Sequence, residues 1–161
     1  MDRRQVRFCE GLTPQPPASP TPADFLQLQA LFQIAAFWAQ DRTVADLETA
    51  IAHSLPIISV WDRERLIGFA RATSDGIYRA TIWDVIVHPD YRGAGLGRQL
   101  VQTLLAHSHL NRVERIYLMT THQQRFYETI GFVPNRSSTM LLYQNAVSQT
   151  PSLEVEIVRA T

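Results

Sequence analysis

Lysine is absent from this chain of 161 residues, and all fifteen of its permanently basic side chains are arginines. Enzymes that form a Schiff base need a lysine amine, and P-loop nucleotide hydrolases and protein kinases need a lysine to hold phosphate. The sequence therefore excludes these three classes of enzyme.

Cysteine, net charge and long apolar runs are also scarce. Cys9 is the only cysteine, and with five scattered histidines it cannot complete a structural zinc set, so we expect no metal and a reducing, cytoplasmic setting. Fifteen acidic residues balance the arginines, which disfavours nucleic acid as a partner. The most apolar stretch, residues 30–39, is too short to span a membrane, and residues 1–11 lack an apolar signal core. We expect a soluble, unprocessed protein without membrane contact, folded as one domain over residues 1–161.

Proline punctuates the first part of the chain. Five of the nine prolines lie in residues 14–22, where their fixed φ angles and missing N–H groups predict a stiff loop. A proline-binding partner could also recognise such a stretch, but a spacer is the simpler interpretation. The loop separates a predicted strand, residues 5–9, from a predicted helix, residues 24–40, whose apolar side chains recur at helical spacing. Thr43 is placed to cap a second helix that ends near His53.

The rest of the chain changes from strands to alternating helices and strands. β-branched and apolar runs predict strands at residues 57–61, 66–72 and 79–87, and these three can pair antiparallel. Helix (95–107), strand (115–119), helix (122–130) and strand (139–143) then follow, which implies a crossover and some parallel pairing. The predicted fold is of the α/β (α+β) class, with a mixed, mostly antiparallel sheet and about four helices. The tail, residues 145–161, has uncertain docking, although residues 153–157 alternate as a strand would.

Glycine is concentrated in one short stretch that follows the strand at 79–87. Three of the seven glycines, Gly93, Gly95 and Gly97, stand within five residues and precede an amphipathic helix. Successive amides in such a loop can converge on an anion, and a helix N-terminus favours phosphate. Arg92 adds a forked cationic donor. The spacing, G-x-G-x-G, matches neither the Walker loop nor the Rossmann fingerprint, so the predicted ligand is a pyrophosphate that is not held as in those folds.

Two motifs together resemble those of one enzyme superfamily. The stretch Val85 to Gly97 spells VxVxPxxRGxGLG, and Phe126 to Phe132 spells FYxxxGF. Both are similar to motifs of the GNAT superfamily of acyl-CoA-dependent N-acetyltransferases, and the similarity covers roughly residues 24–144. The first motif looks most like the plastid and cyanobacterial branch, which has been linked to arylalkylamines, protein lysines and protein N-termini.

The resemblance implies acetyl-CoA as co-substrate. In the family a bulge splays one central strand from its neighbour, and pantetheine lies in the resulting gap; by position this role falls on Val85, Ile86 and Val87. The diphosphate falls to the loop and helix start, a set made up of Arg92, Gly93, Ala94, Gly95, Leu96, Gly97 and Arg98. The apolar character of Val85, Ile86 and Val87 would by itself suit any central strand. Arg98 and Arg125 could reach the 3′-phosphate of CoA or could equally be solvated surface charges.

The resemblance also places a proton donor. Tyr127 matches the family's tyrosine near the thioester sulfur, and a phenol is protonated at neutral pH and can donate to the departing thiolate. The amide of Val85 is expected to meet the oxyanion. Two positions depart from the family's common pattern, since Thr120 and Gln123 stand where many members have asparagine and alanine.

The general base is predicted from the residues themselves. Asp84 interrupts an apolar strand, where an acid is costly to bury unless it is paired or hydrated, so it is expected to face a wet cleft. We predict that it accepts the amine proton, while a structural acceptor at Asp84, or a water chain as base, remains open. His122 and Trp83 are weaker candidates for cleft residues.

These expectations define the predicted function. The chain is expected to transfer acetyl from acetyl-CoA to a primary amine by direct attack in a ternary complex, because Cys9 lies far in sequence from the cofactor loop. The acceptor is expected to be a small arylalkylamine, a protein lysine or an N-terminus. The alternative is a non-catalytic acyl-CoA-binding or sensor module. A homodimer formed by exchange of the 153–157 strand also remains open.

Overall fold

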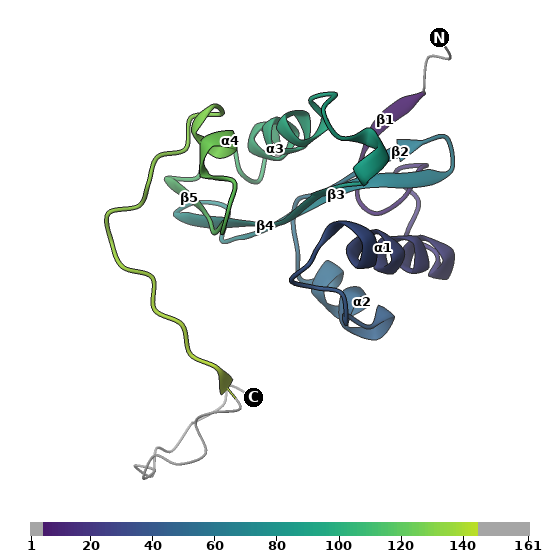
Figure 1. Ribbon diagram of the computed structural model, residues 1–161, viewed down its shortest axis with the longest axis horizontal. Coiled ribbons are helices and arrows are strands. Elements are labelled where there is room, and N and C mark those ends of the chain that lie inside the picture. Colours follow the sequence, from purple (N-terminus) through teal and green to yellow (C-terminus); the bar gives the residue numbers. More distant parts are fainter. Residues whose placement is uncertain (1–4, 145–161) are drawn as a thin grey trace.

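The computed structural model describes residues 5–144, and within that range five strands form one sheet in the order β1-β2-β3-β4-β5 (Figure 1). The strands are β1 (Val6–Glu10), β2 (Ile57–Asp62), β3 (Arg65–Ser74), β4 (Arg79–Val87) and β5 (Arg115–Leu118). The pairs from β1 to β4 are antiparallel, whereas β4 and β5 run parallel. The predicted mixed, mostly antiparallel sheet is confirmed.

Helices cover both faces of this sheet. They are α1 (Pro22–Ala35), α2 (Val44–Ala52), α3 (Leu96–Ala106) and α4 (Gln124–Glu128), with a short 3₁₀ helix, η1 (Pro89–Tyr91), between β4 and α3. Figure 1 shows α1 and α2 on one side of the sheet and α3 and α4 on the other. No helix in the described range combines the length and the hydropathy needed to cross a membrane.

Two apolar cores account for the continuous apolar runs of the central strands. On one face Phe32 of α1 packs with Trp61 and Phe69, and on the other Leu100 of α3 packs with Val60. Because β2 and β3 are covered on both sides, their successive residues are buried whichever way they point, so no polar alternation is present.

The first helix begins where the proline-rich loop ends. The predicted loop at 14–22 contains no strand, and Pro22 opens α1 at a position where its missing N–H is not needed. Thr21 and Asp24 form a capping box: the Asp24 amide donates to Thr21 Oγ1 at 3.3 Å, and the Thr21 amide donates to Asp24 Oδ2 at 2.8 Å.

The predicted helix at 24–40 is shorter in the structure. It ends at Ala35 because Ala36 turns to an extended conformation and, with Ala39, is buried in the core. Gln40 Nε2 donates to the free carbonyl of Gln33, 3.3 Å away, and so holds the end of the helix.

The predicted strand at 139–143 is wrong. This segment runs away from the sheet as an extended chain, and its apolar side chains are exposed, from 93% at Met140 to 69% at Leu142 (Figure 1). A strand exists only where a neighbour completes its hydrogen-bond ladder, and no described strand pairs with this segment. The predicted strand at 153–157 lies outside the described residues, so the single-domain prediction for residues 1–161 stays a prediction.

Candidate functional site

A cleft of about 880 Å³ opens beside the C-terminal half of β4. It is bounded by β4, by the start of α3, by the segment between β5 and α4, and by the residues that follow α1. The predicted site residues that line it are Asp84, Val85, Ile86, Val87, Arg92, Gly93, Gly95, Leu96, Gly97, Arg98 and Tyr127, whereas Ala94 does not. The two motifs, about thirty residues apart in the sequence, therefore meet at one cleft.

The glycine loop presents unpaired backbone donors to this cleft. Gly93 and Gly95 adopt left-handed φ angles of 82° and 81°. Gly95 is the N-cap residue of α3, and no side chain caps this helix start. Among the described residues no acceptor takes the amide protons of residues 93–98, whereas the next amide, that of Gln99, donates to Gly95 O at 3.1 Å. A row of free amides at a helix start is suited to an anion.

The two arginines beside the loop are partly engaged by the protein. Arg92 Nε donates to Val87 O at 3.1 Å, which ties the loop to the end of β4. Arg98 Nη2 donates to Thr129 O at 2.9 Å and so links α3 to the end of α4. Both side chains are exposed, and each guanidinium retains further donors.

The pairing of β4 with β5 ends before Val85, Ile86 and Val87. The parallel ladder between β4 and β5 ends at the pair Ile82 and Leu118. Beyond that point β4 stays paired with β3 alone, with Ile86 opposite Phe69 and Val87 opposite Gly68. The edge of β4 that faces away from β3 is thus without a described strand partner where it lines the cleft.

Tyr127 comes from α4, on the far wall of the cleft. Its ring packs edge-on against Phe126 and Phe132, with centroids 4.9 Å and 5.9 Å away. Burial raises the pKa of the Tyr127 hydroxyl above its ordinary value of 10.0, because the phenolate would lose hydration. The group is therefore a protonated phenol throughout the neutral range. Gly97 lies against this wall, since a Cβ there would be in van der Waals contact with the Phe126 ring, at 3.4 Å.

Asp84 has an unusual backbone and two cationic partners. Its φ angle is +57°, and its carboxylate is only 4% exposed. One oxygen, Oδ2, accepts from Arg71 Nε at 2.7 Å and from Arg42 Nη1 at 2.9 Å. We expected this acid to face a wet cleft, but its carboxylate is buried and paired instead of hydrated. The sequence could not select Arg42 and Arg71 as its partners among fifteen arginines.

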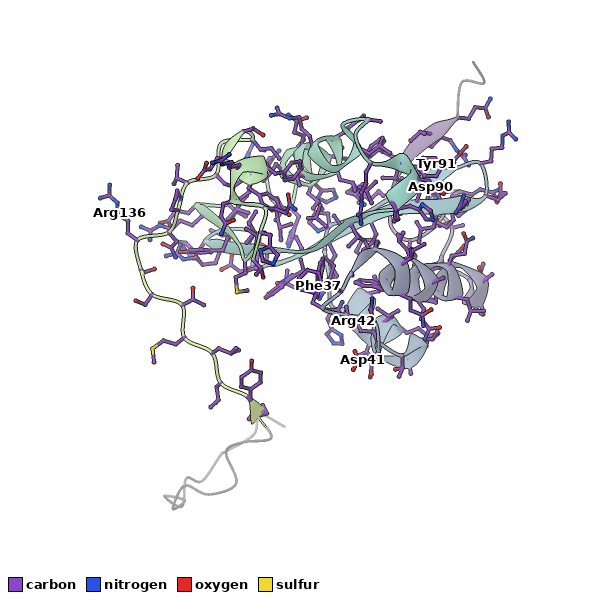
Figure 2. The ribbon with its side chains drawn as sticks, viewed as in Figure 1. Phe37, Asp41, Arg42, Asp90, Tyr91 and Arg136 are labelled. Carbon is purple, nitrogen blue, oxygen red and sulfur yellow. The ribbon has the colours of Figure 1, made fainter. Side chains whose placement is uncertain are left out.

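Two aromatic side chains line the other end of the cleft. The sequence predicted them to be part of the helix at 24–40. Phe37 and Trp38 follow α1 and lie with ring centroids 5.1 Å apart, and Phe37 is 6.4 Å from the ring of His122. Phe37 and Arg42, labelled in Figure 2, both belong to the segment between α1 and α2. Trp83 also lines the cleft, and its Nε1 donates to Thr73 Oγ1 at 2.9 Å.

Clustered metal ligands and a thiol are both missing from the described lining of this cleft. Within residues 5–144 no three histidine, cysteine or carboxylate side chains cluster as metal ligands would. Cys9 lies in β1 and does not line the cleft, and burial raises the pKa of its thiol.

Known proteins resemble this chain in sequence and in fold. An uncharacterized N-acetyltransferase named ycf52-like, from Prochlorococcus marinus, is 38% identical over 114 residues, which cover 68% of this chain and 62% of that protein. A soybean protein named histone acetyltransferase TAP1 is 41% identical over 136 residues, covering 76% of this chain and 58% of the relative. The chain thus spans about three fifths of the length of these curated relatives.

A solved structure and a family model agree with these relatives. A crystal structure described as a GNAT-family acetyltransferase from Xanthomonas campestris superimposes with a TM-score of 0.68 and 28% identity, and the match covers 90% of this chain and 97% of that one. The model of the acetyltransferase (GNAT) family matches residues 24–132, which include β4, the glycine loop and Tyr127. The chain belongs to the GNAT family of acetyltransferases.

Proposed function

We propose that the protein is an N-acetyltransferase that moves the acetyl group of acetyl-CoA to a primary amine by direct attack in a ternary complex. The observation that carries this proposal is the meeting of the two motifs at one cleft: unpaired amides of the glycine loop stand on one wall and the protonated Tyr127 on another. Family membership supports the reaction class.

The residues present suit a coenzyme A molecule. Free amides at residues 93–98 and the positive end of α3 would hold its diphosphate, with Arg92 adding charge. A Cβ at Gly93 or Gly95 would have no protein neighbour within 4 Å, so the space beside both glycines is open to a ligand. The edge of β4 at Val85, Ile86 and Val87 would receive the pantetheine amides as a further strand. Ala94, outside the lining, would contribute only its backbone.

The proton for the departing thiolate would come from Tyr127. Because burial keeps the phenol protonated, the hydroxyl can donate without prior uptake of a proton. The amide of Val85 would stabilise the oxyanion that develops when the amine attacks.

The route by which the amine loses its proton has two candidates. Asp84 lines the cleft, and its role as general base stays a prediction. Two guanidinium groups already hold Oδ2, so a proton arriving there would weaken both ion pairs. These pairs favour transfer through water to solvent, with Asp84 in a structural role.

The acceptor follows the same predicted classes, namely a small arylalkylamine, a protein lysine or an N-terminus. A soybean relative is named a histone acetyltransferase, which places a protein lysine among the amines to be tested. The aromatic rings of Phe37 and Trp38 at the cleft mouth make an arylalkylamine the other priority.

Thiol release tests the proposal. Purified protein with acetyl-CoA and a panel of these amines should liberate CoA, and Tyr127→Phe should lower kcat by a factor on the order of 10² while leaving the Kd for CoA within about threefold. Tyr117→Phe is the matched control, because Tyr117 lies on β5 and does not line the cleft. CoA binding without turnover by any amine would instead identify an acyl-CoA-binding module, and equal rates for Tyr127→Phe would remove this residue from the mechanism.

A further inference from the structure

The bulge in β4 is built on a left-handed aspartate. In the antiparallel ladder Phe69 faces Ile86 and Arg71 faces Trp83, so Ala70 alone stands opposite two residues, Asp84 and Val85. An extra residue of this kind bends a strand and ends its regular pairing. Here the extra residue carries the φ angle of +57°, and the ladder to β5 has ended two residues earlier, at Ile82.

A left-handed angle at a residue other than glycine persists only where its surroundings hold it. At Asp84 the surroundings are two ion pairs that reach three parts of the fold. Arg71 comes from β3 and also donates to Ser54 Oγ at 3.1 Å, near the end of α2, whereas Arg42 comes from the segment between α1 and α2 and lies 4.7 Å from the centroid of the Phe32 ring. The buried carboxylate and the two guanidiniums thus fix one another.

This arrangement joins the two halves of the cleft. Asp84 stands next to Val85, on the edge offered to the cofactor, and Arg42 belongs to the same segment as Phe37 and Trp38 at the acceptor end. Loss of the carboxylate would release both the bulge and that segment.

We propose that Asp84 is a positioning residue. Held by Arg71 and Arg42, its carboxylate maintains the bulge that leaves the edge of β4 free for the cofactor. The same carboxylate docks the segment between α1 and α2, which carries Phe37 and Trp38, against β4. The effect of this clamp on catalysis rests on the proposed function. The clamp itself can be measured without an acceptor.

Three substitutions separate positioning from proton transfer. Asp84→Asn retains an acceptor oxygen and tolerance of positive φ, Asp84→Gly retains only the tolerance, and Asp84→Ala loses both. Positioning predicts graded losses in the order Asn, Gly, Ala: the asparagine variant keeps at least about a tenth of the wild-type kcat and CoA affinity, and the alanine variant loses roughly tenfold more of each. A general base predicts instead that all three lose kcat alike, by 10²-fold or more, with CoA affinity unchanged.

The partners provide an independent measurement. Arg71→Gln should weaken CoA binding and speed amide hydrogen exchange in residues 82–87 of the ligand-free protein, and it should do so much less when Asp84 is already alanine, which removes the acceptor. Arg79→Gln is the matched control, because Arg79 lies on β4, the strand of Asp84, but pairs with Glu114 at the surface, at 3.3 Å. Circular dichroism and thermal melting identify any variant that fails to fold. If the alanine variant does not fold, the milder Asp84→Asn still allows kcat and CoA affinity to be compared with the wild type.

The outcomes keep the two proposals apart. Faster exchange in β4 for Asp84→Ala and Arg71→Gln, but not for Arg79→Gln, supports the clamp even if no amine is acetylated. Unchanged exchange and CoA affinity together with a uniform loss of kcat would overturn the clamp while leaving the acetyltransferase proposal intact.

Discussion

At the scale of single residues, burial determines the chemical form of Tyr127. A phenol in water ionises near pH 10, but this one packs between Phe126 and Phe132, where the phenolate would be poorly solvated. Its pKa is therefore raised, and the neutral hydroxyl is retained to a higher pH than in the unfolded chain.

This shift can be read directly. Tyrosinate absorbance of the wild type minus that of Tyr127→Phe isolates Tyr127, because the other four tyrosines cancel in the difference. The midpoint of this difference titration should lie above pH 10, since burial raises the pKa. The raised pKa also makes the free energy of unfolding depend on pH. The contribution of the buried phenol to this free energy is fully present below pH 10, and it is lost as the pH rises through the pKa of the folded state. A difference midpoint below 10 would contradict both expectations.

At the scale of elements, the glycine loop depends on a backbone conformation that other residues adopt at a cost. Gly95 is left-handed at the N-cap of α3, and a Cβ there would meet nothing within 4 Å. Any effect of alanine at this position must therefore come from backbone strain and from interference with a ligand, not from a clash within the protein.

A second glycine separates these two effects. Gly11, at the end of β1, has a φ angle of 84°, equally open space for a Cβ, and no place in the cleft lining. Gly95→Ala and Gly11→Ala should each lower the free energy of unfolding by about 1–2 kcal/mol, whereas only Gly95→Ala should also weaken CoA binding, by about tenfold or more. Equal CoA affinity for both variants, measured by calorimetry, would remove the loop from the cofactor site.

At the scale of the whole molecule, the described chain combines a tightly packed double core with an exposed apolar segment. Leu100 of α3 is fully buried against the sheet, close to Gly68, while Leu142 is 69% exposed on the segment that leaves it. The same substitution at the two positions should therefore have very different costs.

Leu100→Ala should lower the free energy of unfolding by about 2–5 kcal/mol, since it removes buried apolar contacts and leaves a cavity. Leu142→Ala should change it by less than about 0.5 kcal/mol. Denaturant unfolding at several protein concentrations measures both. A loss above about 1 kcal/mol for Leu142→Ala would mean that this segment is covered in solution by another part of the chain or by a second copy.

Local sequence signals predicted most of the elements that position the site. Apolar runs located β2, β3 and β4, the proline-rich loop preceded α1, and the glycine cluster fell at the start of α3, because each of these depends on neighbours along the chain. The end of α1 and the segment at 139–143 were misjudged. Helical spacing continues past Ala35, but the core holds Ala36 and Ala39 in another conformation. An apolar run continues at 139–143, but no described strand pairs with it.

The chain itself determined the order of its elements, the exclusion of lysine chemistry and the two motifs that mark the family, because spacing, glycine content and residue type are properties of neighbouring positions. Only the tertiary structure decided which side chains Asp84 meets. Arg71 lies 13 residues away and Arg42 lies 42 residues away along the chain, and folding brings both within 3 Å of one carboxylate oxygen. Which of fifteen arginines meets a buried acid depends on the packing of two helices and two strands, and no local pattern contains that information.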